Sequence, residues 1–175
     1  MDYLTKPTSR EVLRELAILF RQVFGLSKTE KFPVLAILDK MSSFFPDVSY
    51  AIVEDSVLPK NIPARCLLNK DGSFLIEISQ TVYEGAYERE VGGYRSHILH
   101  EICHVLLYKI GFTPIVERSF NNNEVAAYCS VEWQAKALCG ELMMPYNATK
   151  YLSVEKIMDK YGVSYEAATQ RKRYN

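Results

Sequence analysis

The segment from Tyr94 to Ile110 constrains the fold of this chain more than any other part of its sequence. Its apolar residues return at the three- and four-residue spacing of an α-helix with one buried face. The residues of that face are Ile98, Leu99, Ile102, Val105 and Leu106. His100 and His104 lie opposite it, four residues apart, so both imidazoles project from one side about one turn apart. The pattern predicts a core helix whose histidines face a cleft.

Glu101 completes the pattern His-Glu-x-x-His between residues 100 and 104. Two neutral imidazoles one turn apart can bind a single Zn²⁺. Glu101 projects beside them, so its carboxylate can reach a water molecule on the metal without binding the metal itself. The spacing therefore predicts His100 and His104 as metal ligands and Glu101 as the catalytic base of metal-assisted hydrolysis.

A catalytic zinc usually has three protein ligands and keeps one position open. The candidates for the third ligand are Glu117, Glu124, Glu132 and Glu141. Glu132 shares a helical stripe with Ala135 and Cys139, and a carboxylate on or beside an apolar face is costly unless a cation accompanies it. Glu124 lies at a suitable distance from His104, but it follows three asparagines and also fits the first turn of a helix. We expect Glu132 to be the ligand and keep Glu124 as the alternative.

The remaining patterns predict an α+β fold: a single, mostly helical domain over residues 1–175 with a small antiparallel three-stranded sheet. Residues 48–53, 64–68 and 74–79 have strand character, and the turn residues 69–73 predict a hairpin between the last two. Helices are expected near residues 9–24, 33–41, 94–110, 130–144, 154–161 and 165–173. The last two form a C-terminal helical appendage over residues 151–175.

Composition favours a cytoplasmic protein. Residues 1–10 are polar and contain no apolar signal core, and no apolar run is long enough to span a membrane. The four cysteines show no Cys-x-x-Cys spacing, and we expect them to be reduced. The 21 basic and 21 acidic residues balance, so direct nucleic-acid binding is not expected. The basic end Arg171-Lys172-Arg173 would be the DNA contact of a regulator, but we expect a solvated helix end.

Three segments resemble the ImmA/IrrE metallopeptidases. They are residues 95–107, Glu132-Trp133-Gln134-Ala135 and Leu142-Met143-Met144-Pro145. That family pairs His-Glu-x-x-His with a later Glu-x-x-Ala segment that ends in Leu-Met-Pro. The resemblance, which covers Arg95 to Pro145, implies a zincin-like fold. It also implies metal ligands at His100, His104 and Glu132 and a catalytic glutamate at Glu101.

Two residues depart from the family pattern, and the role of one histidine stays open. Cys103 stands where the family often has glycine, and we expect it to fit a close-packed position. Lys136 stands where asparagine is common and flanks Glu132, so it could change the surroundings of that ligand. His97 is about 10 Å along the helix axis from His104, too far to share its ion. His97 either lies around the metal ligands or stabilises an oxyanion, or it is an ordinary, partly exposed histidine.

The resemblance further implies a zinc-dependent endopeptidase that cleaves a helix-turn-helix transcriptional repressor in phage, mobile-element or stress regulation. We expect residues 74–79 to be the sheet edge that pairs with an extended substrate. The alternative function is that of a non-catalytic metal-binding sensor or interaction protein on the same scaffold. Water at the fourth position of the metal would favour the enzyme, and a fourth protein ligand would favour a structural site.

Overall fold

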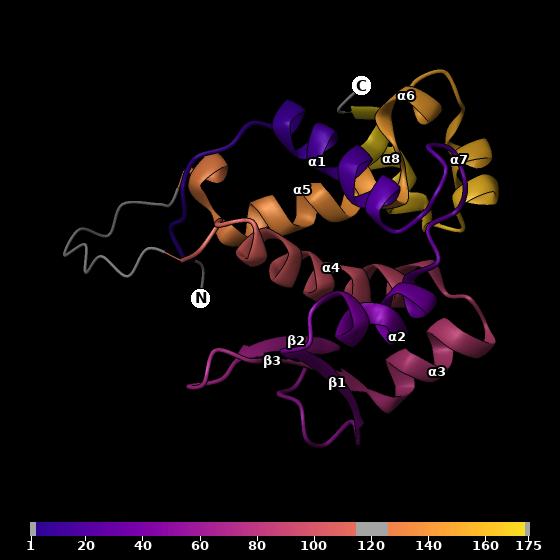
Figure 1. The fold of residues 1–175 in the computed structure, drawn as a ribbon. Helices are drawn as coiled ribbons and strands as arrows, with labels where there is room; N and C mark the ends of the chain where they lie inside the picture. Colours follow the sequence, from indigo (N-terminus) through magenta and orange to yellow (C-terminus); the bar gives the residue numbers. More distant parts are fainter. Residues whose placement is uncertain (1–2, 115–125, 174–175) are drawn as a thin grey trace.

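The computed structural model describes residues 3–114 and 126–173 and has the α+β architecture that the sequence predicts (Figure 1). The helices are α1 (Arg10–Val23), α2 (Val34–Phe44), α3 (Gln80–Glu88), α4 (Gly92–Lys109), α5 (Val131–Met143), α6 (Tyr146–Thr149), α7 (Val154–Tyr161) and α8 (Tyr165–Arg173), and a 3-10 turn spans Ala127–Cys129. The strands are β1 (Val48–Val53), β2 (Ala64–Leu68) and β3 (Phe74–Ser79). Within the described residues, no helix combines the length and apolarity needed to cross a bilayer.

The hairpin between β2 and β3 forms where the turn residues predict it. The N–H of Asn69 donates to the carbonyl of Ser73, and Asp71 accepts from the backbone N–H and the hydroxyl of Ser73. Gly72 adopts a φ of +85°, a conformation that costs glycine little because it has no Cβ. These bonds fix the antiparallel register of the two strands, with Cys66 opposite Ile76.

The sheet is mixed, so the expectation of a fully antiparallel sheet is wrong for one of its two pairings. The strand order is β1-β3-β2, and β1 runs parallel to β3 with Val48 opposite Phe74. After β1, residues 54–63 carry the chain across to the far side of the sheet, where β2 forms. The hairpin then brings the chain back, and β3 pairs with β1 on one side and with β2 on the other. β3 is therefore the central strand and has no free edge.

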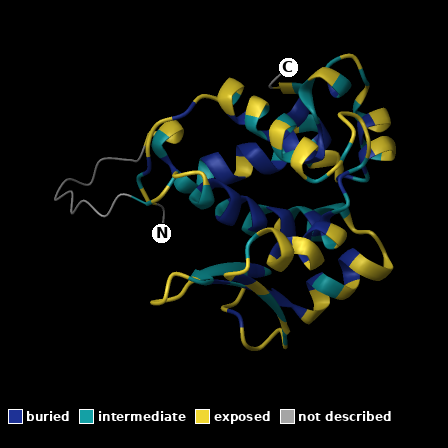
Figure 2. Ribbon diagram, in the orientation of Figure 1, coloured by how far each residue is buried: buried dark blue, intermediate teal, exposed yellow. Residues whose placement is uncertain are grey.

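Helix α4 forms the centre of the fold, between the sheet and α5 (Figure 1). Ile98, Leu99, Ile102 and Leu106 are completely buried, and the burial map shows the helix as a nearly continuous core element (Figure 2). His100 and His104 keep partly exposed side chains on the remaining side. The predicted division into a buried face and a histidine face is confirmed.

Helix α5 begins beside the N-terminal segment of the chain. Ser130 caps the helix by accepting from the N–H of Trp133 at 2.9 Å. The N–H of Val131 donates to the carbonyl of Tyr3, and the N–H of Thr5 donates to that of Cys129. Residues 3–8 thus run alongside the 3-10 turn and fix the position at which α5 starts.

The end of α8 is turned into the protein, so the expectation of a solvated basic end is wrong for Arg171. Its guanidinium is buried and donates to Glu141 of α5 at 2.8 Å and to the hydroxyl of Thr149 at 3.2 Å. The same oxygen of Glu141 accepts from Arg10 and Arg14 of α1, each at 3.2 Å. A buried carboxylate therefore joins α1, α5 and α8.

Candidate metal centre

His100 and His104 of α4 and Glu132 of α5 form a cluster that can hold a metal ion. The Nε2 atoms of the two histidines lie 3.0 Å apart. The Glu132 carboxylate lies 3.2 Å from the Nε2 of His100 and 3.4 Å from that of His104. Their spacing on α4 brings the histidines together, and the packing of α5 against α4 adds Glu132.

The chemistry of the three donors fits zinc. With metal–ligand bonds of about 2.0–2.1 Å, donors in a tetrahedral zinc site lie about 3.3 Å apart, close to the separations in this cluster. Two imidazole nitrogens and one carboxylate oxygen are a typical donor set of catalytic zinc sites. Interaction with both histidines holds the pKa of Glu132 well below its usual range, while burial lowers the pKa of His100. Both shifts favour the protonation states that bind a metal: an ionised carboxylate and a neutral imidazole.

Glu101 lies between the two histidines in sequence and is not one of the clustered donors. Burial raises the pKa of its carboxyl to about 7, and the charge of His104 opposes the rise. The backbone of Cys66 in β2 lies close enough to Glu101 to lower the pKa of its carboxyl slightly. No pattern in the sequence predicts this contact, because the backbone group comes from another element.

The cluster lies in a cleft of about 560 Å³ between β2, α4 and the start of α5. The hydrogen bonds from Asn69 to Ser73 and from Ser79 to Pro63 fix which groups of β2 face β3. Because antiparallel strands alternate, the backbone groups of Ala64, Cys66 and Leu68 point away from β3. The free edge beside the cluster is therefore β2, which corrects the expectation that residues 74–79 form it.

His97 and Lys136 line the same cleft without joining the cluster. Both residues are largely accessible to solvent, but the neighbouring atoms partly desolvate the imidazole of His97 and lower its pKa. The positive charge of Lys136 is one of the smaller causes of the lowered pKa of His100, so this departure from the family pattern acts on the cluster electrostatically. Cys103 is fully buried in the core, in agreement with the close-packed position expected for it.

The other candidates for the third ligand fall into two groups. Glu141 is bonded to three arginines and is not part of the cluster. Glu117 and Glu124 lie outside the described residues. Of the two candidates within the described residues, Glu132 is the one that lies beside the histidines.

Comparison with known proteins identifies one family. The family model Peptidase_M78, described as an IrrE N-terminal-like domain, matches residues 88–172. The matched segment contains α4, α5 and all three clustered donors. A comparison with curated proteins gives no significant match. The resemblance recognised in the sequence is thereby confirmed at the level of the family.

Proposed function

Because residues 88–172 of this chain form an IrrE N-terminal-like domain of the Peptidase_M78 family, we propose that the protein is a zinc-dependent endopeptidase. The observation that carries the proposal is the cluster of His100, His104 and Glu132 on the wall of an open cleft. The proposed ligands are these three residues, and the proposed catalytic base is Glu101. A fourth protein ligand within the described residues would have pointed to a structural site, but the cluster has three members.

The side chains of the cleft support peptide hydrolysis. A zinc ion held by the three proposed ligands would supply Lewis acidity able to acidify a water molecule and polarise a carbonyl group. The Glu101 carboxylate takes a proton from the attacking water and then delivers it to the leaving amine. The backbone of Cys66 lowers the pKa of this carboxyl and so favours the ionised form that accepts the proton. Lys136 lines the cleft, and its positive charge can stabilise the negative charge that develops on the carbonyl oxygen of a substrate.

The free edge of β2 supports binding of an extended peptide. Strand addition uses the outward backbone groups of an edge strand, and those of Ala64 and Leu68 flank Cys66 on the cleft side. A bound segment would lie beside Glu101 and the metal ligands. Since a helical segment cannot pair with a strand edge, the cleaved bond belongs in an extended linker or a locally unfolded segment of the substrate.

We propose a helix-turn-helix transcriptional repressor as the substrate. This part of the proposal rests on the family resemblance, and the cleft adds the requirement for an extended segment. The repressor encoded beside the gene is the first protein to test. Zinc-loaded protein is incubated with it, and the fragments are identified by mass spectrometry; cleavage at one bond is expected.

Two variants separate hydrolysis from metal binding. The double variant His100→Ala/His104→Ala should lose both zinc and cleavage, whereas Glu101→Gln should keep zinc and lose cleavage. Elemental analysis should give about one Zn²⁺ per chain of the unsubstituted protein. A protein that binds zinc but leaves the repressor uncut, while still forming a complex with it, would instead support the sensor or interaction function.

A further inference from the structure

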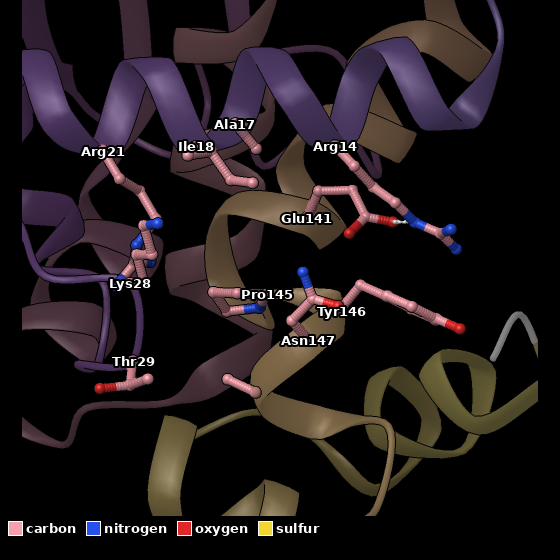
Figure 3. Close-up of a pocket in the computed structure, with 11 residues that line it drawn as sticks. Arg14, Ala17, Ile18, Arg21, Lys28, Thr29, Glu141, Pro145, Tyr146 and Asn147 are labelled. Atoms are coloured by element: carbon pink, nitrogen blue, oxygen red, sulfur yellow. Dashed lines mark hydrogen bonds and ion pairs between the residues drawn. The ribbon is translucent and has the colours of Figure 1, made fainter.

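A second cavity, of about 230 Å³, lies between α1, residues 28–29 and the segment Pro145–Ala148 (Figure 3). It shares no lining residue with the cleft of the metal cluster. Its apolar wall consists of Ala17 and Ile18 on one side and Pro145 and Ala148 on the other. The cavity is therefore a separate site, to which the proposed function assigns no role.

One end of this cavity contains a buried positive charge, that of Arg21. Its side chain is 1% exposed, and its guanidinium donates to the backbone carbonyls of Ser27, Glu30 and Leu142. Among the described residues, no carboxylate lies within ion-pair distance of Arg21. Buried charges are normally paired, and a guanidinium has more N–H donors than these contacts use. Arg21 can therefore still donate to an anion.

Lys28 places a second positive charge at the same end of the cavity, beside Arg21 (Figure 3). Its side chain is exposed, and within the described ranges its ammonium makes no hydrogen bond or ion pair. The charge of Glu30 acts on Arg21 from beyond ion-pair distance, so both cations can still contact a bound carboxylate through charge-assisted hydrogen bonds.

The opposite end of the cavity does not cancel this charge. Among the described residues that line the cavity, Glu141 carries the one carboxylate, and one of its oxygens already accepts from three guanidiniums. Arg14, one of those three, also lines the cavity and lies 3.9 Å from the centre of the Tyr146 ring. The lining thus combines three cations with one acidic group that is already engaged, and its net charge is positive.

We propose that this cavity binds a small organic acid, with its carboxylate at Lys28 and Arg21 and its apolar body between Ile18 and Pro145. The volume lies below the range of about 300–1,000 Å³ that is typical of drug-sized ligands. The size therefore favours a small aromatic or branched aliphatic acid. The apolar wall excludes a bare inorganic anion as the best ligand, because such an ion would leave that surface without a partner.

Three small molecules separate the contribution of the ligand's carboxylate from that of its apolar part. Phenylacetate has both, phenylacetamide has the same shape without the charge, and acetate has the charge without the ring. Each is titrated into the full chain, and binding is followed by the backbone amide signals in nuclear magnetic resonance spectra. We expect saturable shifts at Ile18, Thr29 and Asn147 with phenylacetate, and dissociation constants at least about tenfold weaker, roughly 1.4 kcal/mol, for the other two probes.

Lys28→Gln should weaken phenylacetate binding about tenfold without affecting folding, because the side chain is exposed and its ammonium makes no hydrogen bond or ion pair with the described residues. Lys40→Gln is the matched control: Lys40 is an exposed lysine of α2 outside the cavity, and its loss should leave binding unchanged. Equal binding of phenylacetate and phenylacetamide, unchanged binding in Lys28→Gln, or no saturable shift with phenylacetate would each overturn the proposal. Because the readout is binding, each outcome is independent of whether the protein is a peptidase.

Discussion

Replacing Glu141 with glutamine removes the negative charge at the junction of α1, α5 and α8 but keeps the shape of the side chain. Glu141 is 2% exposed and Arg171 is 1% exposed, and their ion pair measures 2.8 Å. Without the carboxylate, the guanidinium of Arg171 stays buried and loses its counter-ion. The perturbation therefore tests whether a buried charge pair, rather than apolar contact alone, holds α8 against α5.

The expected cost follows from the burial of this pair. Removing one partner of a buried ion pair destabilises proteins by about 3–5 kcal/mol, a large share of a total free energy of unfolding of about 5–15 kcal/mol. For a chain of this length, that loss corresponds to a fall in melting temperature of about 6–20 °C. Arg10 and Arg14 contribute less to it, because both are partly exposed and water can solvate them.

Chemical denaturation with urea measures the free energy of unfolding, and Glu90→Gln is the matched control. Glu90 pairs with Lys31 at 2.5 Å, a shorter distance, but its side chain is 68% exposed and that of Lys31 is 36% exposed. Exposed pairs contribute about 0–1 kcal/mol, so Glu90→Gln should change stability little. If Glu141→Gln costs no more than Glu90→Gln, the argument from burial fails. The double variant Glu141→Gln/Arg171→Met should lose less stability than the two single variants added together.

Three further predictions concern the site and α4. Glu101→Gln should keep zinc bound and slow cleavage by about 10²–10⁴, and an unchanged rate would eliminate Glu101 as the base. In a chelator competition, Glu132→Ala should weaken zinc binding strongly while Glu124→Ala leaves it intact; the opposite result would make Glu124 the ligand. Gly92→Ala should destabilise the protein by about 1–3 kcal/mol, because the new Cβ would lie 2.5 Å from the carbonyl oxygen of Gly162. At Gly93, a new Cβ would lie in open space, so Gly93→Ala should stabilise the protein by up to about 1 kcal/mol. Equal free energies of unfolding for the two variants would contradict the close packing of Gly92 against Gly162.

Local signals in the sequence predicted much of the fold. The turn residues Asn69–Ser73 fix the ends of β2 and β3, and Ser130 marks the start of α5. Helix α3 was not predicted, because it follows β3 without a break: Ser79 ends the strand and also caps the helix. The order of the strands could not be predicted from local patterns, because the periodicity of β1 does not indicate which strand it pairs with.

The site shows the same division between local and long-range information. The four-residue spacing of His100 and His104 places their side chains together on any helix, so sequence alone could predict the pair. The sequence could only favour Glu132 over Glu124, from its place beside an apolar helix face and from the family pattern, because its approach to the histidines depends on how α5 packs on α4. The contact between Cys66 and Glu101 and the inward turn of Arg171 are long-range interactions that no local periodicity encodes.

The pairing of residues 3–8 with the start of α5 has a consequence for the order in which the protein folds. The histidine pair exists as soon as α4 has formed, but Glu132 is placed by contacts such as that between Gln134 and Lys6, which are 128 positions apart. Contacts between distant segments carry the entropy cost of closing a long loop and tend to form late. We therefore expect the three donors to come together near the end of folding, and a chain that lacks residues 1–8 to bind zinc more weakly in a chelator competition. Residues 3–8 would then be among the last to take their final place.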